Sequence, residues 1–503
     1  MAGNPFAIAA RRVNTPTKRS FEAAQHSRLT ADWLRAWIQS ALQDVRYDNR
    51  TMRARARDLE KNHPHVKRFL RLVEKNVIGP TGIRLEPKNR MQRGSKLHEE
   101  GNDTLAVSWS DWTRKEHCTV TGTMSWNSAS RLILRTMVRD GEAFVRKWRY
   151  FDNPHGFALQ LLDADLVDEL YEVRSLPNGN YIKMGIEFTP FGRPAAYHVW
   201  NQHPQDTGWG SLALVRERIP ATEIEHLFIP NRVGQPRGVT WFHAVMKTLK
   251  IDGGYSEAEL VSARTAAAKM GFIITNGDDA GPDPTEDEDA SDRLMEGAPG
   301  AIDELDPGQD FKAWDPQHPA GNFAPFKAAI LREASVGLDA AYASLTGDLS
   351  DVNYSSIRTG ILDERDTWKE LQNWTIEHLN DPVFRAWLPC AQLAGACPLA
   401  GPPERWSDIA WRPRGWAWVD PLKDSQAAVI DKDNGFNSRT RICAENGEDF
   451  YEILEELAAE EAAAKTLGVV ITAPPKNDPN NNAPSTDEEG KPKRGRLHLA
   501  RSH

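Results

Sequence analysis

RGVTWFHAVMKTLKIDGGYSEAELVSARTAAAKMGFIITN, which covers Arg237–Asn276, is the part of the sequence that constrains the fold most. Its pattern predicts a helix from Trp241 to Met270. That helix would span about 45 Å at 1.5 Å per residue, with the pair Gly253-Gly254 as a soft point or kink. Its second half is rich in small residues, so it offers few large apolar side chains to a globular core.

Downstream of this helix the sequence passes through acidic, helical and polar segments. Residues Gly277–Asp310 carry thirteen Asp or Glu against Arg293. A second helix is expected over Phe323–Leu345, followed by a Gly/Ser/Asp loop at Thr346–Ser356. A third helix with an apolar stripe is expected to end near Pro389. The order is therefore helix, acidic insert, helix, polar loop and long helix.

The first half of the chain changes from helical to strand-like patterns. Apolar residues over 34–45 have helical spacing, and another helix is expected from Pro64 to the stop at Gly79. Between Ser130 and Pro230 short β-rich runs alternate with turn signals, and TPFGRP joins two of them as a hairpin turn. This spacing favours a mainly antiparallel sheet over alternating parallel strands and helices. The fold class is therefore α+β.

Composition limits the classes of protein to which the chain can belong. Its 503 residues, 40% of them hydrophobic, suffice for roughly two to four domains with a sizeable core. A formal net charge of -9 argues against a protein whose main task is to hold DNA phosphates, because that task needs many Lys and Arg side chains. Four scattered cysteines indicate reduced thiols, and no apolar run approaches the roughly 18 residues of a membrane span.

Catalytic motifs were sought, and the sequence lacks the common ones. It has no GxxxxGK[ST], HExxH or GxSxG motif, and no GxGxxG after a strand. Asp163 and Asp165 are a possible acid pair for a metal-dependent DNA-processing enzyme, but no Lys or His lies at a useful spacing. His63 and His65 flank a helix-starting proline and are interpreted as structural. The acidic insert lacks the spacing of a calcium loop, which favours a solvated loop or docking surface over a metal site.

Tryptophan is unusually frequent, with seventeen residues in the chain. Tryptophan often anchors subunit interfaces, but core packing is the favoured interpretation for each residue. Six of them lie close together in the C-terminal third, between residues 374 and 418, namely Trp374, Trp387, Trp406, Trp411, Trp416 and Trp418.

The two ends of the chain differ from its centre. Residues 1–28 are Arg-rich and nearly free of acid, which predicts an exposed basic arm. The segment after Ile471 is rich in Pro and Asn and ends with a basic cluster, so it is expected to be disordered. That cluster either touches DNA or only solubilises the tail, and it comprises Lys491, Lys493, Arg494 and Arg496.

An ordered set of sequence blocks resembles the lambda family of phage portal proteins over roughly residues 30–460. The helix, acidic insert, helix, loop and helix described above form the second half of the resemblance. The blocks of the first half are RARDLEKNHPHVKRFLRLVEKNVIGPTGIRL, RDGEAFVRKW, LQLLDADLVDE, GIEFTPFGRPAAYHVW and IPATEIEHLFIPNRVGQPRGVTWF.

The resemblance implies a portal fold with named regions. These are a basic disordered arm at 1–28, a wing of helices and β-rich segments at 29–240, a first stem helix at 241–272, a clip at 273–321, a second stem helix at 322–345, a tunnel loop at 346–356, a return to the wing at 357–419, a helical crown at 420–469 and a disordered tail at 470–503.

The resemblance also implies a function that is geometric rather than catalytic. A closed, head-to-tail ring of twelve copies would form the channel at one vertex of a phage head, through which double-stranded DNA is packaged and ejected. Implied partners are the terminase large subunit, the head-completion and neck proteins, and the major capsid and scaffold proteins. No cofactor and no membrane are implied, and the protein would reside in the virion after assembly in the host cytoplasm. The alternatives are another head-tail adaptor ring and the DNA-processing enzyme.

Three groups of residues are candidates for functional contacts in such a ring. Residues of the tunnel loop would face DNA: Thr346, Gly347, Asp348, Leu349, Ser350, Asp351, Asn353 and Tyr354. Cations of the stem would form weak rings around the lumen, although solvated outer faces or intersubunit salt bridges fit them equally well: Lys247, Lys250, Arg264, Lys269, Lys327 and Arg332. Acids of the clip would meet the terminase: Asp278, Asp279, Asp283, Glu286, Asp287, Glu288 and Asp289.

Overall fold

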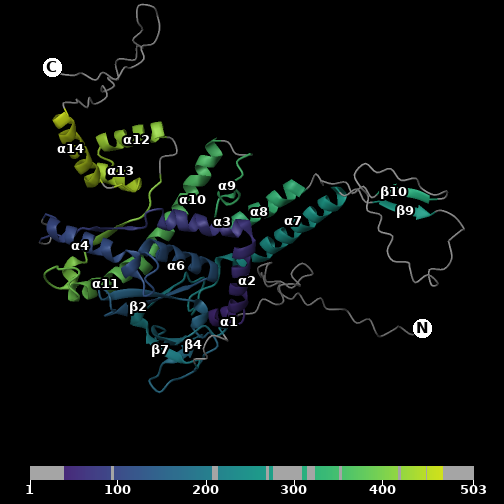
Figure 1. Cartoon of the computed structure of the whole chain (residues 1–503), viewed down its shortest axis with the longest axis horizontal. Helices are drawn as coiled ribbons and strands as arrows, with labels where there is room; N and C mark the ends of the chain where they lie inside the picture. Colours follow the sequence, from purple (N-terminus) through teal and green to yellow (C-terminus); the bar gives the residue numbers. More distant parts are fainter. Residues whose placement is uncertain are drawn as a thin grey trace, which may run out of the picture.

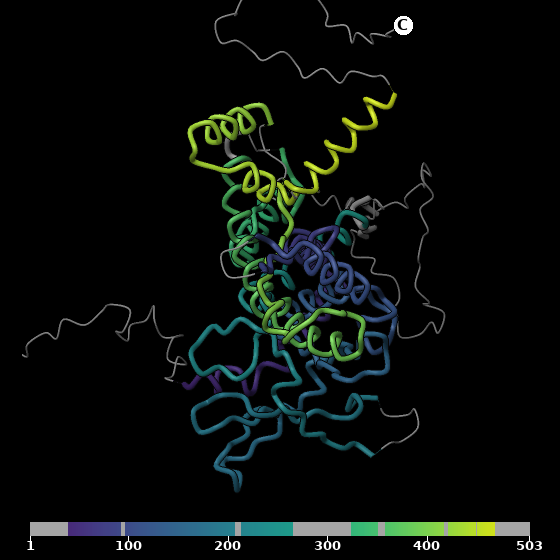
Figure 2. The backbone as a smooth tube through the Cα atoms, turned by 90° about the vertical axis from the view of Figure 1, so that its left-hand side faces the viewer, coloured from purple at the N-terminus to yellow at the C-terminus, as the bar shows by residue number. Residues whose placement is uncertain are grey.

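The computed structural model describes residues 39–91, 96–206, 213–267, 271–275, 309–313, 323–350, 354–416, 421–448 and 450–467. They form a body of helices and antiparallel sheets, from which one pair of helices projects (Figure 1). Figure 2 shows from a second direction that the C-terminal helices stand apart from the sheets. The predicted α+β class is confirmed. The expected arm at 1–28 and tail at 470–503 lie outside the described residues.

Helices and one π-helical turn build the first part of the body. The predicted helix from Pro64 to Gly79 is confirmed, because Pro64 occupies its first turn and Gly79 ends it with a φ of 77°. The bounds are α1 Ala41–Arg46, α2 Asn49–Asn62, α3 Pro64–Val73, η3 Glu74–Ile78, α4 Glu99–Trp112, α5 Lys115–Cys118 and α6 Trp126–Asp140.

The structure corrects the prediction that strands begin at Ser130. That residue lies inside α6, which continues to Asp140 and buries Ile133 and Met137 one turn apart. The apolar residues of this segment therefore follow a helical period, and Gly141 ends the helix in the left-handed conformation.

Two antiparallel sheets follow α6, as the turn spacing predicted. The first has the strand order β3-β2-β8 and the second β4-β5-β6-β7. The TPFGRP turn joins β5 to β6, and Thr189 N donates to Arg193 O at 2.8 Å across it. The bounds are β2 Ala143–Arg149, β3 Phe157–Leu162, η4 Ala164–Leu166, β4 Tyr181–Lys183, β5 Ile186–Phe188, β6 Pro194–Trp200, β7 Arg216–Pro220, η5 Ala221–Glu223 and β8 Ile224–Leu227.

The main core of the body is built around tryptophan. Trp109, Trp112 and Trp387 pack with ring centroids 4.8 to 6.3 Å apart, and Trp112 and Trp387 are fully buried. Core packing is therefore confirmed for Trp387 and, at 3% exposure, for Trp406. The chain also closes on itself through β1 (Arg84–Pro87), which pairs with β11 (Ile409–Arg412).

The helix predicted from Trp241 to Met270 is present in the described residues. A short 3-10 turn, η6 (Trp241–Ala244), precedes α7 (Met246–Ala267), which runs as one α-helix through Gly253 and Gly254. It lies beside α8 (Phe323–Gly337), and we call these two the helix pair. Figure 1 shows the helix pair running away from the body toward β9 (Gly271–Thr275) and β10 (Gln309–Ala313), which pair antiparallel.

The second predicted helix, Phe323–Leu345, is broken, which is a correction. After α8 ends at Gly337, Asp339 takes a φ of 52°. Asp339 N then donates to Val336 O at 3.2 Å and Ala340 N to Ser335 O at 3.0 Å, the pattern of a Schellman cap. A separate short helix, α9 (Tyr342–Thr346), follows.

Two further boundaries differ from prediction. The polar loop is shorter than 346–356, because α10 (Tyr354–Thr375) has already begun at Tyr354. The following helix continues through the turn η7 (Ile376–Asn380) into α11 (Asp381–Leu393) and passes Pro389. Apolar side chains of α11 on both sides of the proline are buried, and their packing outweighs the hydrogen bond that proline removes.

The C-terminal helices expected over 420–469 are present, and they pack little within the chain. None of the side chains described in α12 (Pro421–Asp433), α13 (Arg439–Glu445) or α14 (Phe450–Leu467) is buried. The body ends before them with the 3-10 turn η8 (Pro403–Trp406) and β11. No described helix is both long and apolar enough to cross a membrane.

Candidate functional site

Aromatic rings and a lysine hold the two helices of the helix pair together near the start of α8. Tyr255 of α7 packs against Phe323 and Phe326 of α8, with ring centroids 5.5 and 5.2 Å apart. Beside them, Lys327 Nζ donates a hydrogen bond to Ser256 Oγ at 2.7 Å. These contacts fix the relative position of two helices that are far apart in sequence.

A buried carboxylate joins the base of the helix pair to the body. Asp252 of α7 is 2% exposed, and its Oδ2 lies 3.6 Å from His63 Nε2 and 4.0 Å from Lys327 Nζ. Burial and the charge of neighbouring His65 lower the pKa of His63, although Asp252 opposes this. His63 therefore has the structural role that was predicted, at the point where α3, α7 and α8 meet.

The candidate lumen cations occupy different environments. Lys247, Lys250 and Arg264 are exposed on α7. The amine of Lys327 is held between the helices, and the guanidinium of Arg332 lies over the Tyr342 ring at 5.1 Å. Lys269 lies outside the described residues. The facing of these residues in a ring stays a prediction.

The candidate loop between α9 and α10 is polar and exposed in its described part. Thr346 ends α9, and Gly347 adopts a φ of 79° that turns the chain. Asp348 then accepts hydrogen bonds from the backbone and hydroxyl of Ser350, while the Leu349 side chain is 60% exposed. Asp351 and Asn353 lie outside the described residues, Tyr354 begins α10, and the contact of this loop with DNA stays a prediction.

The acidic candidates of the insert lie outside the described residues. They are Asp278, Asp279, Asp283, Glu286, Asp287, Glu288 and Asp289. The segments that flank the insert, β9 and β10, are paired over five residue positions from Gly271 opposite Ala313 to Thr275 opposite Gln309. The pairing of β9 with β10 therefore brings the two flanks of the insert together.

A buried ion network that sequence reasoning missed connects α2, α6 and the sheets. Glu142 is fully buried and accepts hydrogen bonds from Arg237 at 2.6 to 2.9 Å, from Arg53 at 3.0 Å and from Gly238 N at 3.1 Å. Its Oε2 also lies 3.0 Å from His226 Nε2. Burial alone would raise the pKa of Glu142, but Arg237 and His226 outweigh it and hold the pKa well below its usual range.

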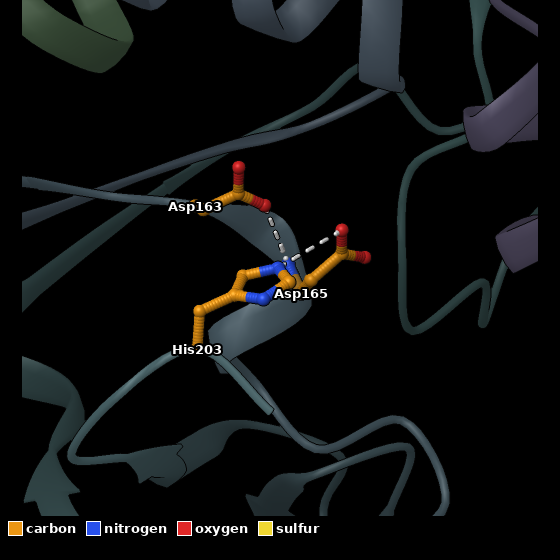
Figure 3. A group of neighbouring side chains, drawn as sticks. All are labelled: Asp163, Asp165 and His203. Carbon is orange, nitrogen blue, oxygen red and sulfur yellow. Dashed lines mark hydrogen bonds and ion pairs between the residues drawn. The ribbon is translucent and has the colours of Figure 1, made fainter. Parts of the chain in front are cut away.

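The acid pair Asp163 and Asp165 lies at the edge of this network. The chain brings His203 to it, so that one ligand atom of each residue lies within 4.8 Å of the others (Figure 3). Sequence spacing did not reveal this histidine, because it follows β6, whereas Asp163 caps η4 and Asp165 lies inside it.

The two carboxylates are already paired with arginine. Arg57 donates to Asp163 Oδ1 at 2.8 Å and to Asp165 Oδ2 at 2.7 Å, and Arg53 also pairs with Asp165. A divalent cation would have to displace these guanidinium groups, which supply the positive charge that the acids need. The geometry therefore supports a structural ion cluster over a metal centre.

Comparison with known proteins identifies the family. Residues 26–372 match the family model described as "Phage portal protein, lambda family". A "Probable portal protein" of Halomonas phage phiHAP-1 is 34% identical over 475 residues, which cover 93% of this chain and 91% of that protein. "Portal protein B" of Escherichia phage lambda is 19% identical over 462 residues, with 83% and 84% of the two chains covered.

Solved structures show a weaker similarity. A chain from the neck of a native gene transfer agent (GTA) particle, computed with C12 symmetry, has a TM-score of 0.42 and 14% identity over 78% of this chain and 92% of its own. A chain from the virion of the native GTA particle has a TM-score of 0.44 and 15% identity over 80% and 93%. The family match and the Halomonas phage relative carry the assignment: this chain belongs to the lambda family of phage portal proteins.

Proposed function

We propose that the protein forms a closed ring of twelve copies at one vertex of a phage head and that double-stranded DNA passes through the ring during packaging and ejection. In this proposal α7 and α8 are the stem, the insert between β9 and β10 is the clip that docks the terminase large subunit, and α12 to α14 belong to the crown. Neck proteins replace the terminase once the head is full. The ring contributes geometry and no catalysis, and it resides in the virion after assembly in the host cytoplasm beside capsid and scaffold proteins.

The observation that carries the proposal is the exposure of the helix pair. From Gly253 to Arg264, α7 has no buried residue, and Leu260 and Val261 are 71% and 58% exposed. On α8, Phe326 is 50% exposed although it contacts Tyr255. Exposed apolar side chains grouped on a projecting element are typical of an interaction surface. A second copy on each side of the helix pair would cover them.

The charge distribution fits passage of DNA better than retention of DNA. The stem carries separate cations, such as Lys247, Lys250 and Arg264, rather than a continuous basic groove. Separate cations neutralise few phosphates, and tight binding needs many. The acidic insert repels phosphate and therefore offers DNA no place to bind at that end.

The test is the mass and symmetry of the purified full chain. Native mass spectrometry is expected to give a species of about 0.68 MDa, twelve times the 56.4 kDa chain, and negative-stain images should show rings with a central hole. A stable monomer or dimer that cleaves DNA with added magnesium would overturn the proposal. In that case Asp163→Ala and Asp165→Ala should abolish cleavage.

A further inference from the structure

An open groove lies where the end of α8, the last turns of α10 and the segment before α7 meet. Its volume is about 590 Å³, within the range of small-ligand and peptide pockets, roughly 300–1,000 Å³. Its floor is apolar and includes Phe69, Trp368 and Leu371, while Trp241 and Trp374 are half-buried in its walls. None of the interactions assigned above to the ring or to DNA uses this groove.

The rim of the groove is acidic. Asp339, Glu370 and Glu377 are exposed there, and the described residues that line the groove include no Lys or Arg. The carboxylates of Glu370 and Glu377 have no ion-pair partner among the described residues. An occupant with apolar side chains and several positive charges would therefore complement both the floor and the rim.

The chain itself contains such a segment, upstream of the first described residue. Residues 5–21, PFAIAARRVNTPTKRSF, contain four Lys or Arg, no Asp or Glu, and large apolar side chains such as Phe6 and Ile8. The described chain begins at Gln39, whose carbonyl accepts a hydrogen bond from Arg232 Nη2 at 3.1 Å. The neighbouring Asn231 lines the groove. Residues 22–38, when extended, reach at most about 56 Å, so the segment can return to the groove.

We propose that residues 5–21 of the same chain bind this groove, with apolar side chains on the tryptophan floor and basic side chains at Glu370 and Glu377. The tether favours the chain's own segment, because a linker of this length gives an effective concentration on the order of millimolar. The groove is lined by the C-terminal cap of α8 and by α10. The bound segment would therefore bridge these two elements, which precede and follow α9. Ring formation is not required, so the inference stands or falls independently of the proposed function.

The test places the photo-crosslinker p-benzoyl-phenylalanine at Phe6 in the full chain. Illumination is expected to crosslink residue 6 to a peptide from 229–243 or 367–377 of the same chain. Mass spectrometry should find this crosslink in the gel band that contains a single chain. The yield should fall about fivefold at 0.5 M NaCl, because salt screens exposed charges. It should fall about tenfold in the variant Glu370→Lys/Glu377→Lys.

A matched control and a binding measurement make the test decisive. The variant Glu116→Lys/Glu404→Lys changes two exposed acids away from the groove and should keep the wild-type yield. A chain lacking residues 1–21 should bind a synthetic 5–21 peptide, and Glu370→Lys/Glu377→Lys should weaken that binding about tenfold. Crosslinks between copies or to other surfaces would overturn the proposal. Equal binding of the peptide by the truncated chain with and without Glu370→Lys/Glu377→Lys would also overturn it.

Discussion

The body and the helix pair differ in how many of their side chains find partners within the chain. In the body, Glu142 is fully buried and its carboxylate contacts two arginines, a histidine and a backbone N–H. In the helix pair, α7 leaves Leu260 and Val261 in solvent. The described body therefore buries charged and apolar side chains against partners of the same chain, whereas the described part of the helix pair leaves apolar side chains exposed. Substitutions in the two regions should differ accordingly in their effect on the stability of one subunit.

The largest effect on subunit stability is expected from Glu142→Ala. This change leaves Arg53 and Arg237 buried without their shared partner, and the free energy of unfolding should fall by roughly 3–5 kcal/mol. Urea unfolding followed by tryptophan fluorescence measures it, because α7 and α8 contain no tryptophan, whereas twelve of the seventeen tryptophans lie in the described body. The control Glu257→Ala, at an exposed position of α7, should change the value by less than about 0.5 kcal/mol. Equal effects of the two variants would contradict the comparison.

Two glycines offer a second contrast, with opposite signs. A Cβ on Gly238 would lie 2.0 Å from Gly141 O in the body, so Gly238→Ala should lower stability by about 3 kcal/mol. A Cβ on Gly254 of α7 meets nothing within 4 Å, so Gly254→Ala should stabilise the helix by about 1 kcal/mol. Urea unfolding measures the first change, and hydrogen exchange of α7 in dissociated subunits measures the second. Faster exchange in Gly254→Ala would show that this glycine has a local role.

The contrast also explains which features the sequence could predict. Local signals identified the α7 helix, the Pro64 helix start and the TPFGRP hairpin, because period and turn chemistry act over a few residues. The break after α8 was missed, since its cap uses Asp339 in a conformation that glycine usually adopts.

The buried network could not be predicted, since it joins residues far apart in sequence. Arg53, Glu142 and Arg237 come from three widely separated segments of the chain, and each resembles an ordinary surface charge in its local sequence. His203 reaches Asp165 for the same reason, through a loop that follows β6. Such pairings depend on the tertiary fold. In the sequence, only the blocks that resemble the family indicated that fold.

The pH dependence of stability should also distinguish the body. His226 is buried between Phe144 and Phe228, and burial lowers its pKa although Glu142 opposes this. The unfolded chain therefore binds this proton more readily, so the stabilisation is present above about pH 6.5 and is lost as the pH falls. His226 should contribute a slope of up to about 1.4 kcal/mol per pH unit below that value.

Urea unfolding between pH 7.5 and 5 measures this slope. The variant His226→Phe preserves the ring stack and removes the titrating group, so its stability should fall less steeply with acid than that of the wild type. Other histidines with a lowered pKa, such as His155 and His198, keep part of the slope in both proteins. Glu142 does not contribute in this range, because a carboxyl with a lowered pKa affects stability only below its unfolded value near pH 4.5. Identical slopes in the two proteins would exclude His226 as a source.

The smallest effect on subunit stability is expected where the effect on assembly is greatest. Leu260→Asp replaces a side chain that is 71% exposed, so the unfolding free energy of the subunit should change by less than about 0.5 kcal/mol. If neighbouring copies cover α7, the same charge would be buried at each interface of the ring, and native mass spectrometry should show dissociated subunits. Val107→Asp is the matched control, because Val107 is 69% exposed on α4 of the body and lies outside the helix pair. Rings that persist in Leu260→Asp would mean that this face of α7 stays in solvent after assembly, and the subunit contacts would then have to lie on the body or on α12 to α14.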